Sequence, residues 1–248
     1  MTRNSPGTGQ LTAINSISAN ALNASYSAQL LPYFQLLFVL LLGTVLLSAG
    51  GCSALPDKPV RASLYDFGPG NLVARPATEA ARLPPIAIDD ITTPGGSLDN
   101  VAVLYRLAYQ DAQQLRPYSL ASWALPPAQL VRQRLRDTLS QRRAVFGAGD
   151  SAAMNRSQNA VLPQLLRLEL EEFSQFFSAA DASVGLIRLR ATLLEVTPSG
   201  EKLVGQRSVV MQRPATSSDA IGGVRALTAA TDAAVEELDQ WIQQNTTR

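Results

Sequence analysis

The feature that most constrains this chain is an apolar run near its start that ends at a cysteine. The run extends from Leu36 to Leu47, four small residues follow at 48–51, and Cys52 comes next as the only cysteine in the sequence. A run of about a dozen residues is shorter than the ~20 that cross a bilayer comfortably, and it matches the ~7–15 of a signal-peptide core. We therefore expect residues 1–51 to be a signal peptide that takes no part in the fold.

The residues around Cys52 resemble the lipobox of bacterial lipoprotein precursors, in which signal peptidase II cleaves before a cysteine that carries diacylglycerol. The resemblance implies that Cys52 becomes the first residue of the mature protein and carries acyl chains such as palmitate. Two or more such chains hold a protein stably on a membrane. The sequence departs from the pattern at Ala49, where leucine is preferred, and in having only Arg3 as a charge ahead of Cys52. An uncleaved signal anchor is the alternative interpretation.

A segment rich in Pro, Ala, Gly and Arg covers residues 52–83. Such a composition cannot bury a continuous apolar face, so we expect a tether that leads from the lipid to the folded part. Within it, Ser63–Gly68 predicts a short edge strand. The remaining residues, 84–248, are long enough for one domain with a sizeable core.

The charge and residue inventory argues against several functions. Of 21 Lys and Arg residues one is Arg3, which leaves 20 to balance 20 Asp and Glu, so the basic field that nucleic-acid binding requires is missing. The sequence has no histidine, which removes His-dependent triads and the commonest metal ligand. It also has no phosphate-binding loop, dinucleotide fingerprint or G-x-S-x-G elbow. We therefore expect that the protein is not an enzyme and that it binds no metal and no cofactor. An envelope hydrolase is disfavoured for the same reason.

Turn signals and hydrophobic periodicity divide the first half of the domain. Three strands are expected first, at 85–91, 101–109 and 114–122. A helix follows, because Pro126 and Pro127 are tolerated at the first helical positions. Its apolar stripe at helical spacing consists of Ala128, Val131, Leu135 and Leu139.

Alternation of apolar and polar residues marks the strands of the second half. The inward set is Leu166, Leu168 and Leu170 in one strand and Ile187, Leu189, Ala191 and Leu193 in the next. Hairpin turns separate these strands, which predicts an antiparallel meander, and a long amphipathic helix begins at about Ser218. The expected fold is α+β: a single domain with a mainly antiparallel sheet and two amphipathic helices packed on it.

Several segments occur in a familiar order: the lipobox and tether, Tyr105–Tyr109, Trp123-Ala124 before a Pro-started helix, Glu172–Phe177, Leu189–Ala191 and an Ala-rich last helix. This order resembles the ABC-type transport auxiliary lipoproteins, whose best-known branch is PqiC. The resemblance implies a lipid-anchored, periplasm-facing protein that works with an MCE-domain protein and a membrane transporter in moving lipids between the envelope membranes. Ser53 stands where Asp retains enterobacterial lipoproteins in the inner membrane, which favours the outer membrane. The alternative is a periplasmic lipid-binding carrier, which would need an apolar cavity.

Two groups of residues are candidates for binding. Five arginines could contact lipid headgroups or an acidic partner, or could simply form a solvated helix face: Arg132, Arg134, Arg136, Arg142 and Arg143. In the strand that follows Leu170, alternation sends Phe176 inward and leaves Phe173 and Phe177 on the outer face, provided that no bulge intervenes. We therefore expect Phe173 and Phe177 to pack against another chain, either an MCE-type partner or a neighbouring copy of this domain.

Overall fold

The computed structural model describes residues 33–43, 60–70, 83–147, 162–197 and 199–246. The chain divides into two compact units, 1–59 and 60–248. In the first unit, residues 33–43 form a helix. No helix within the described ranges is both long enough and apolar enough to cross a membrane. Cys52 and the cleavage site predicted before it lie outside the described residues.

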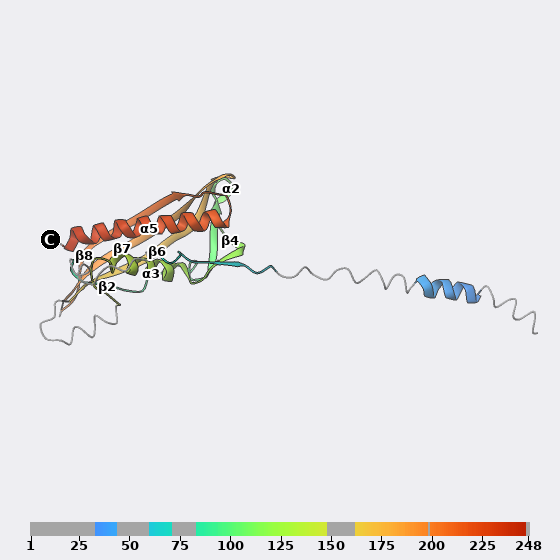
Figure 1. The fold of residues 1–248 in the computed structure, drawn as a ribbon, viewed down its shortest axis with the longest axis horizontal. Helices are drawn as coiled ribbons and strands as arrows, with labels where there is room; N and C mark the ends of the chain where they lie inside the picture. Colours follow the sequence, from blue (N-terminus) through green and yellow to red (C-terminus); the bar gives the residue numbers. More distant parts are fainter. Residues whose placement is uncertain (1–32, 44–59, 71–82, 148–161, 198, 247–248) are drawn as a thin grey trace, which may run out of the picture. The chain divides into compact units, whose positions relative to one another are not determined.

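Within its described residues, the second unit is built on a sheet of eight strands (Figure 1). The strands of the first half are β1 (Ser63–Tyr65), β2 (Ile86–Ile88), β3 (Ala102–Leu107), β4 (Ala112–Trp123) and β5 (Val145–Gly147). The strands of the second half are β6 (Gln164–Ala179), β7 (Ala182–Thr197) and β8 (Gly200–Pro214). Most strands of the first half are short, whereas those of the second half are long and consecutive.

Strand β6 lies at the centre of the sheet. Along one edge it pairs with β7, which in turn pairs with β8, and both pairings are antiparallel. Its other edge is shared by β2 and β3, which both run parallel to it. Strand β4 is antiparallel to β3, while β1 joins β4 and β5 joins β2 in parallel. The antiparallel meander is confirmed for the second half, but the sheet as a whole is mixed and not mainly antiparallel.

Two amphipathic helices cover one face of this sheet, α3 (Pro127–Leu139) and α5 (Ala220–Thr246). Helix α3 has Pro127 in its first turn, where the missing N–H costs nothing, and its predicted stripe is buried. Helix α5 packs along β7 and β8, and α3 lies against α5. A third, four-residue helix, α2 (Ala108–Asp111), joins β3 to β4. The two expected amphipathic helices are present, but the described residues also form α2 and the helix at 33–43, so the predicted helix count fits only in part.

The core lies between the sheet and these helices. All seven residues predicted to point inward from β6 and β7 are buried there. An aromatic cluster closes one part of it: Trp123 contacts Phe67 and Phe173, with ring centroids 5.6 Å apart in each case. The edge strand predicted at 63–68 forms over 63–65 as β1, and Phe67, two residues after it, is part of the core.

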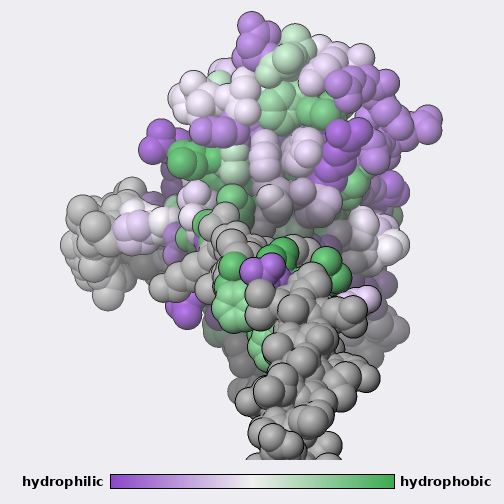
Figure 2. Space-filling view, turned by 90° about the vertical axis from the view of Figure 1, so that its right-hand side faces the viewer, coloured by the Kyte–Doolittle hydropathy of each residue, from purple (hydrophilic) through white to green (hydrophobic). Residues whose placement is uncertain are grey.

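The opposite face of the long strands carries charge. Arg167 Nε lies 3.1 Å from Asp89, and its Nη1 lies 2.7 Å from Glu201 on β8. Arg190 on β7 pairs in the same way with Glu171 on β6. Figure 2 looks onto a different side of the domain, the end near α2 and β4, where hydrophobic residues in the upper part form small areas among hydrophilic ones. Such a surface is typical of a protein face in contact with water.

Candidate functional site

A cleft lies along the exposed side of α3. It has a volume of about 650 Å³ and separates α3 from the segment that follows β2. Its apolar lining is Ile91, Leu125, Pro126 and Ala128, and its polar lining is Asp90, Asp99, Gln129, Arg132, Gln133 and Arg136. We call this cleft the α3 groove. Helical spacing explains part of this lining, because Ala128, Arg132 and Arg136 recur every four residues and so lie along one side of α3.

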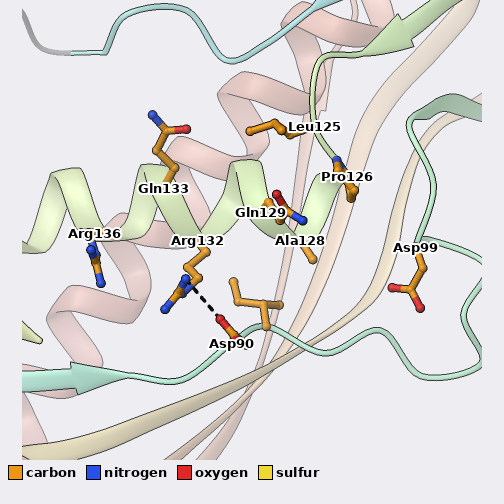
Figure 3. A pocket seen from close by; sticks show the side chains of 10 residues that line it. Asp90, Asp99, Leu125, Pro126, Ala128, Gln129, Arg132, Gln133 and Arg136 are labelled. Atoms are coloured by element: carbon orange, nitrogen blue, oxygen red, sulfur yellow. Dashed lines mark ion pairs between the residues drawn. The ribbon is translucent and has the colours of Figure 1, made fainter. Parts of the chain in front are cut away.

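Two of the predicted arginines reach into the α3 groove. Figure 3 shows Arg132 and Arg136, one turn apart, pointing to the same side of the helix toward the segment that holds Asp90, whereas Gln133 points away. Arg132 Nη1 lies 3.1 Å from the Asp90 carboxylate, which is 84% exposed. Because that carboxylate is well hydrated, the ion pair is weak. Arg132 Nε is buried and has no hydrogen-bond partner within the described part of the chain.

The α3 groove has a surplus of positive charge on its helix side. The Arg136 guanidinium is exposed and forms no hydrogen bond or ion pair with the described residues. Across the groove, Asp99 accepts a hydrogen bond from the Thr93 hydroxyl and lies farther along the same β2–β3 connection as Asp90. A groove lined by a free guanidinium and by apolar side chains suits a ligand that carries both an anionic group and an apolar group. An acidic, partly apolar protein segment and a lipid headgroup both have this character.

The other three predicted arginines are used inside the fold. Arg134 lies 3.3 Å from Asp232 on α5, donates a hydrogen bond to the Phe67 carbonyl, and sits 5.9 Å from the centre of the Phe67 ring. It therefore fastens the segment after β1 to both helices. None of these contacts leaves its guanidinium available to a ligand.

Arg142 and Arg143 both bind Asp239 on α5, at 3.2 and 2.8 Å. The side chains of Arg143 and Asp239 are almost fully buried. Burial lowers the pKa of Arg143, and the neighbouring Asp239 opposes that shift. A charge at this depth needs its partner, so the pair joins the end of α3 to α5 and has no evident binding role.

The prediction that Phe173 and Phe177 lie on the outer face of β6 is wrong. Phe173 is 1% exposed and packs against Trp123, and Phe177 is 5% exposed and meets the Tyr105 ring edge-on at 6.1 Å. Phe176 is the half-exposed member of the group. The two rings belong to the core, so the argument that made them partner contacts no longer holds.

A β-bulge is the reason for this reversal. Leu170 pairs with Leu189 and Glu172 with Arg188, so Glu171 is an extra residue in β6. The extra residue exchanges the two faces for everything that follows it. The sequence carried a signal for it, because the adjacent acidic residues Glu171 and Glu172 interrupt the alternation of apolar and polar side chains.

Sequence reasoning also missed a buried polar network under the start of α5. Gln175 is fully buried; it accepts a hydrogen bond from Tyr118 and donates one to Ser183, both at 2.8 Å. Burial, with a smaller contribution from Tyr105, raises the pKa of Tyr118 to about 12. Every group in the network is satisfied and neutral, which indicates a structural role.

Comparisons with known proteins agree with this architecture. A family model described as the ABC-type transport auxiliary lipoprotein component matches residues 65–239. No curated protein matches the chain.

Two solved structures share its fold. A protein from Xanthomonas campestris assigned to the family DUF330 has a TM-score of 0.55 and 17% identity, and the match covers 74% of this chain and 96% of that one. An uncharacterized protein has a TM-score of 0.51 and 13% identity, with 73% and 99% covered. At these sequence identities, the similarity to both proteins shows a shared fold and nothing more.

Proposed function

The chain belongs to the family of ABC-type transport auxiliary lipoprotein components, and on this premise we propose that it is the binding and assembly part of an MCE/ABC-type system that moves lipids between the envelope membranes. Membership makes it a lipid-anchored protein of the cell envelope. In the proposal Cys52 carries the lipid and the domain faces the periplasm, with the anchor in the outer membrane. The chain catalyses nothing itself.

The α3 groove is the observation that supports a binding role. Its lining includes the free guanidinium of Arg136 and, farther along the groove, the apolar side chains of Ile91 and Leu125. The MCE-domain partner would insert an acidic segment with apolar neighbours, so that a carboxylate meets Arg136. Charged pairs at the rim of an interface guide encounter and fix register.

The same groove argues against the alternative of a lipid carrier. Acyl chains need an enclosed apolar cavity. The α3 groove is instead bordered by two arginines and two aspartates, and the space between sheet and helices is filled by the core side chains. Binding through headgroup or protein contacts fits this lining better than burial of acyl chains.

The test is co-purification of the MCE-domain protein and the transporter of the same system with charge-reversed variants. Arg136→Glu is expected to weaken capture of the partner at least about tenfold, because it places like charges against each other. Arg225→Glu is the matched control, since Arg225 is an exposed arginine on α5, away from the groove. Equal capture by both variants would contradict the proposed docking site, and failure of the wild type to capture either protein would contradict the proposed function.

A further inference from the structure

Strand β8 is a long edge that the described part of the fold leaves open. It runs for 15 residues, pairs only with β7, and exposes most of its side chains although α5 lies nearby. A free edge presents unpaired N–H and C=O groups to any strand that reaches it, and proteins normally protect such edges. A strand this long and open therefore calls for an explanation.

The pairing with β7 fixes which backbone groups of β8 point outward. Ala215 N–H donates to the Ser183 carbonyl at 2.9 Å, and the ladder keeps one register from Val184–Pro214 to Leu193–Gly205. Hydrogen-bonded and non-hydrogen-bonded pairs alternate in an antiparallel ladder. The odd-numbered residues of this stretch thus bond to β7, and the even-numbered residues direct their backbone groups to the free edge. Pro214 is even-numbered, where its missing N–H disturbs nothing.

Features that hinder pairing with another strand occur only at the two ends of this edge. Pro214 lies at one end. At the other end, the register with β7 shifts opposite Leu194, and Lys202 adds a charge. The window between them, Gln206–Gln212, contains no proline and no glycine. Its one charge, Arg207, is bound to Glu237 on α5 at 2.6 Å. The window thus offers free backbone groups and no charge that would select or repel a charged strand.

We propose that this window pairs with the same window of a second copy of the chain, antiparallel, about a two-fold axis at Val209. Gln206 then faces Gln212 of the other copy and Ser208 faces Val210, and each facing pair exchanges two backbone hydrogen bonds. Amide side chains meet at both ends of the window. The register also sets Arg207 opposite Met211, so no like charges meet. This self-complementarity is what favours a second copy over another protein. The proposal depends on β8 alone and stands apart from the α3 groove.

Disulfide trapping tests the register in the full lipid-modified chain in mild detergent. With Gln206→Cys and Gln212→Cys combined, mild oxidation with diamide is expected to give a covalent dimer, because hydrogen-bonded antiparallel pairs have Cα atoms about 5.5 Å apart. The bond cannot form within one chain, where six residues of strand separate the two positions by roughly 20 Å. Each single substitution is the matched control and is expected to stay unlinked. Equal linking by a single variant would overturn the register.

Native mass spectrometry of the same preparation tests the association itself. The wild type is expected as a dimer or a higher even-numbered species. Ser208→Pro removes an outward donor without breaking the ladder to β7, so association is expected to weaken about tenfold or more while the circular dichroism stays unchanged. Ser208→Ala keeps the donor and is expected to associate like the wild type. A monomeric wild type, or a folded proline variant that associates normally, would overturn the proposal.

Discussion

The two faces of the long strands β6 and β7 are held by different forces. The face toward α5 is apolar and closely packed, and Leu166, Leu189 and Leu193 on it are fully buried. The other face is mostly exposed and carries ion pairs such as that of Arg167 with Glu201, apart from a small buried cluster that Leu165 and Leu194 form with Ala87. Buried apolar side chains contribute kilocalories each, whereas exposed ion pairs contribute little. Stability should therefore depend on one face of the sheet and solubility on the other.

The largest expected effect separates two phenylalanines of the same strand. Phe173→Ala should lower the free energy of unfolding by about 3–5 kcal/mol, because it empties a space between Trp123 and Phe67. Phe176→Ala, three residues along and half-exposed, should cost about 1 kcal/mol or less. Urea denaturation of both variants measures the difference. Equal losses would mean that the bulge after Leu170 does not exchange the faces.

A smaller effect is expected where the core-side face touches α5 most closely. A Cβ added at Gly185 would lie 2.4 Å from backbone atoms of Ala226 and Leu227, so Gly185→Ala forces the helix to move. A loss of about 1–3 kcal/mol is expected. Gly205→Ala is the matched control on β8, since its nearest neighbour would be a Trp241 side-chain carbon at an ordinary 3.4 Å. Thermal unfolding of the two variants compares them, and similar melting temperatures would contradict the close approach of α5 to β7.

The smallest effect is expected on the charged face. Arg167→Ala removes contacts to Asp89 and Glu201, but because Arg167 is about half exposed the expected loss is only ~0.2–1 kcal/mol per pair. Screening should shrink that loss further in about 1 M NaCl. Arg188 lies on the same face and forms no ion pair with the described residues, so Arg188→Ala should change stability less. A loss as large as that of Gly185→Ala would show that this face does more than keep the domain in solution.

The same division explains how much of the fold the sequence predicts. Alternation from Leu166 to Leu170 and the helical stripe that includes Val131 are local patterns, and the structure confirms both. The parallel pairings of the first half are not local, since Ile86 pairs with Gln164, which is about 80 residues farther along the chain. The periodicity of apolar residues within either strand does not predict which other strand it pairs with. A mixed sheet was therefore read as mainly antiparallel.

The candidate site divides in a similar way. Helical spacing places Arg132 and Arg136 on an outer side of α3, and the structure finds both in the α3 groove. The roles of Arg134 and Arg143 depend on Asp232 and Asp239, which lie about a hundred residues away on α5. Phe173 was misplaced because one extra residue, Glu171, reverses every later side chain. The periodicity of apolar residues predicts neither contacts between residues distant in sequence nor the position of a single-residue bulge.

Mass spectrometry of the intact lipid-modified protein in mild detergent separates an assembly component from a carrier most directly. The mass should equal that of the protein with its covalent anchor, with phospholipid far below one molecule per chain, because the described groove is charged and the core is filled. The Arg136→Glu variant should give the same spectrum, since the groove is proposed to bind protein. A phospholipid retained in equimolar amount by the wild type and lost by Arg136→Glu would contradict the assembly role and make the chain a carrier.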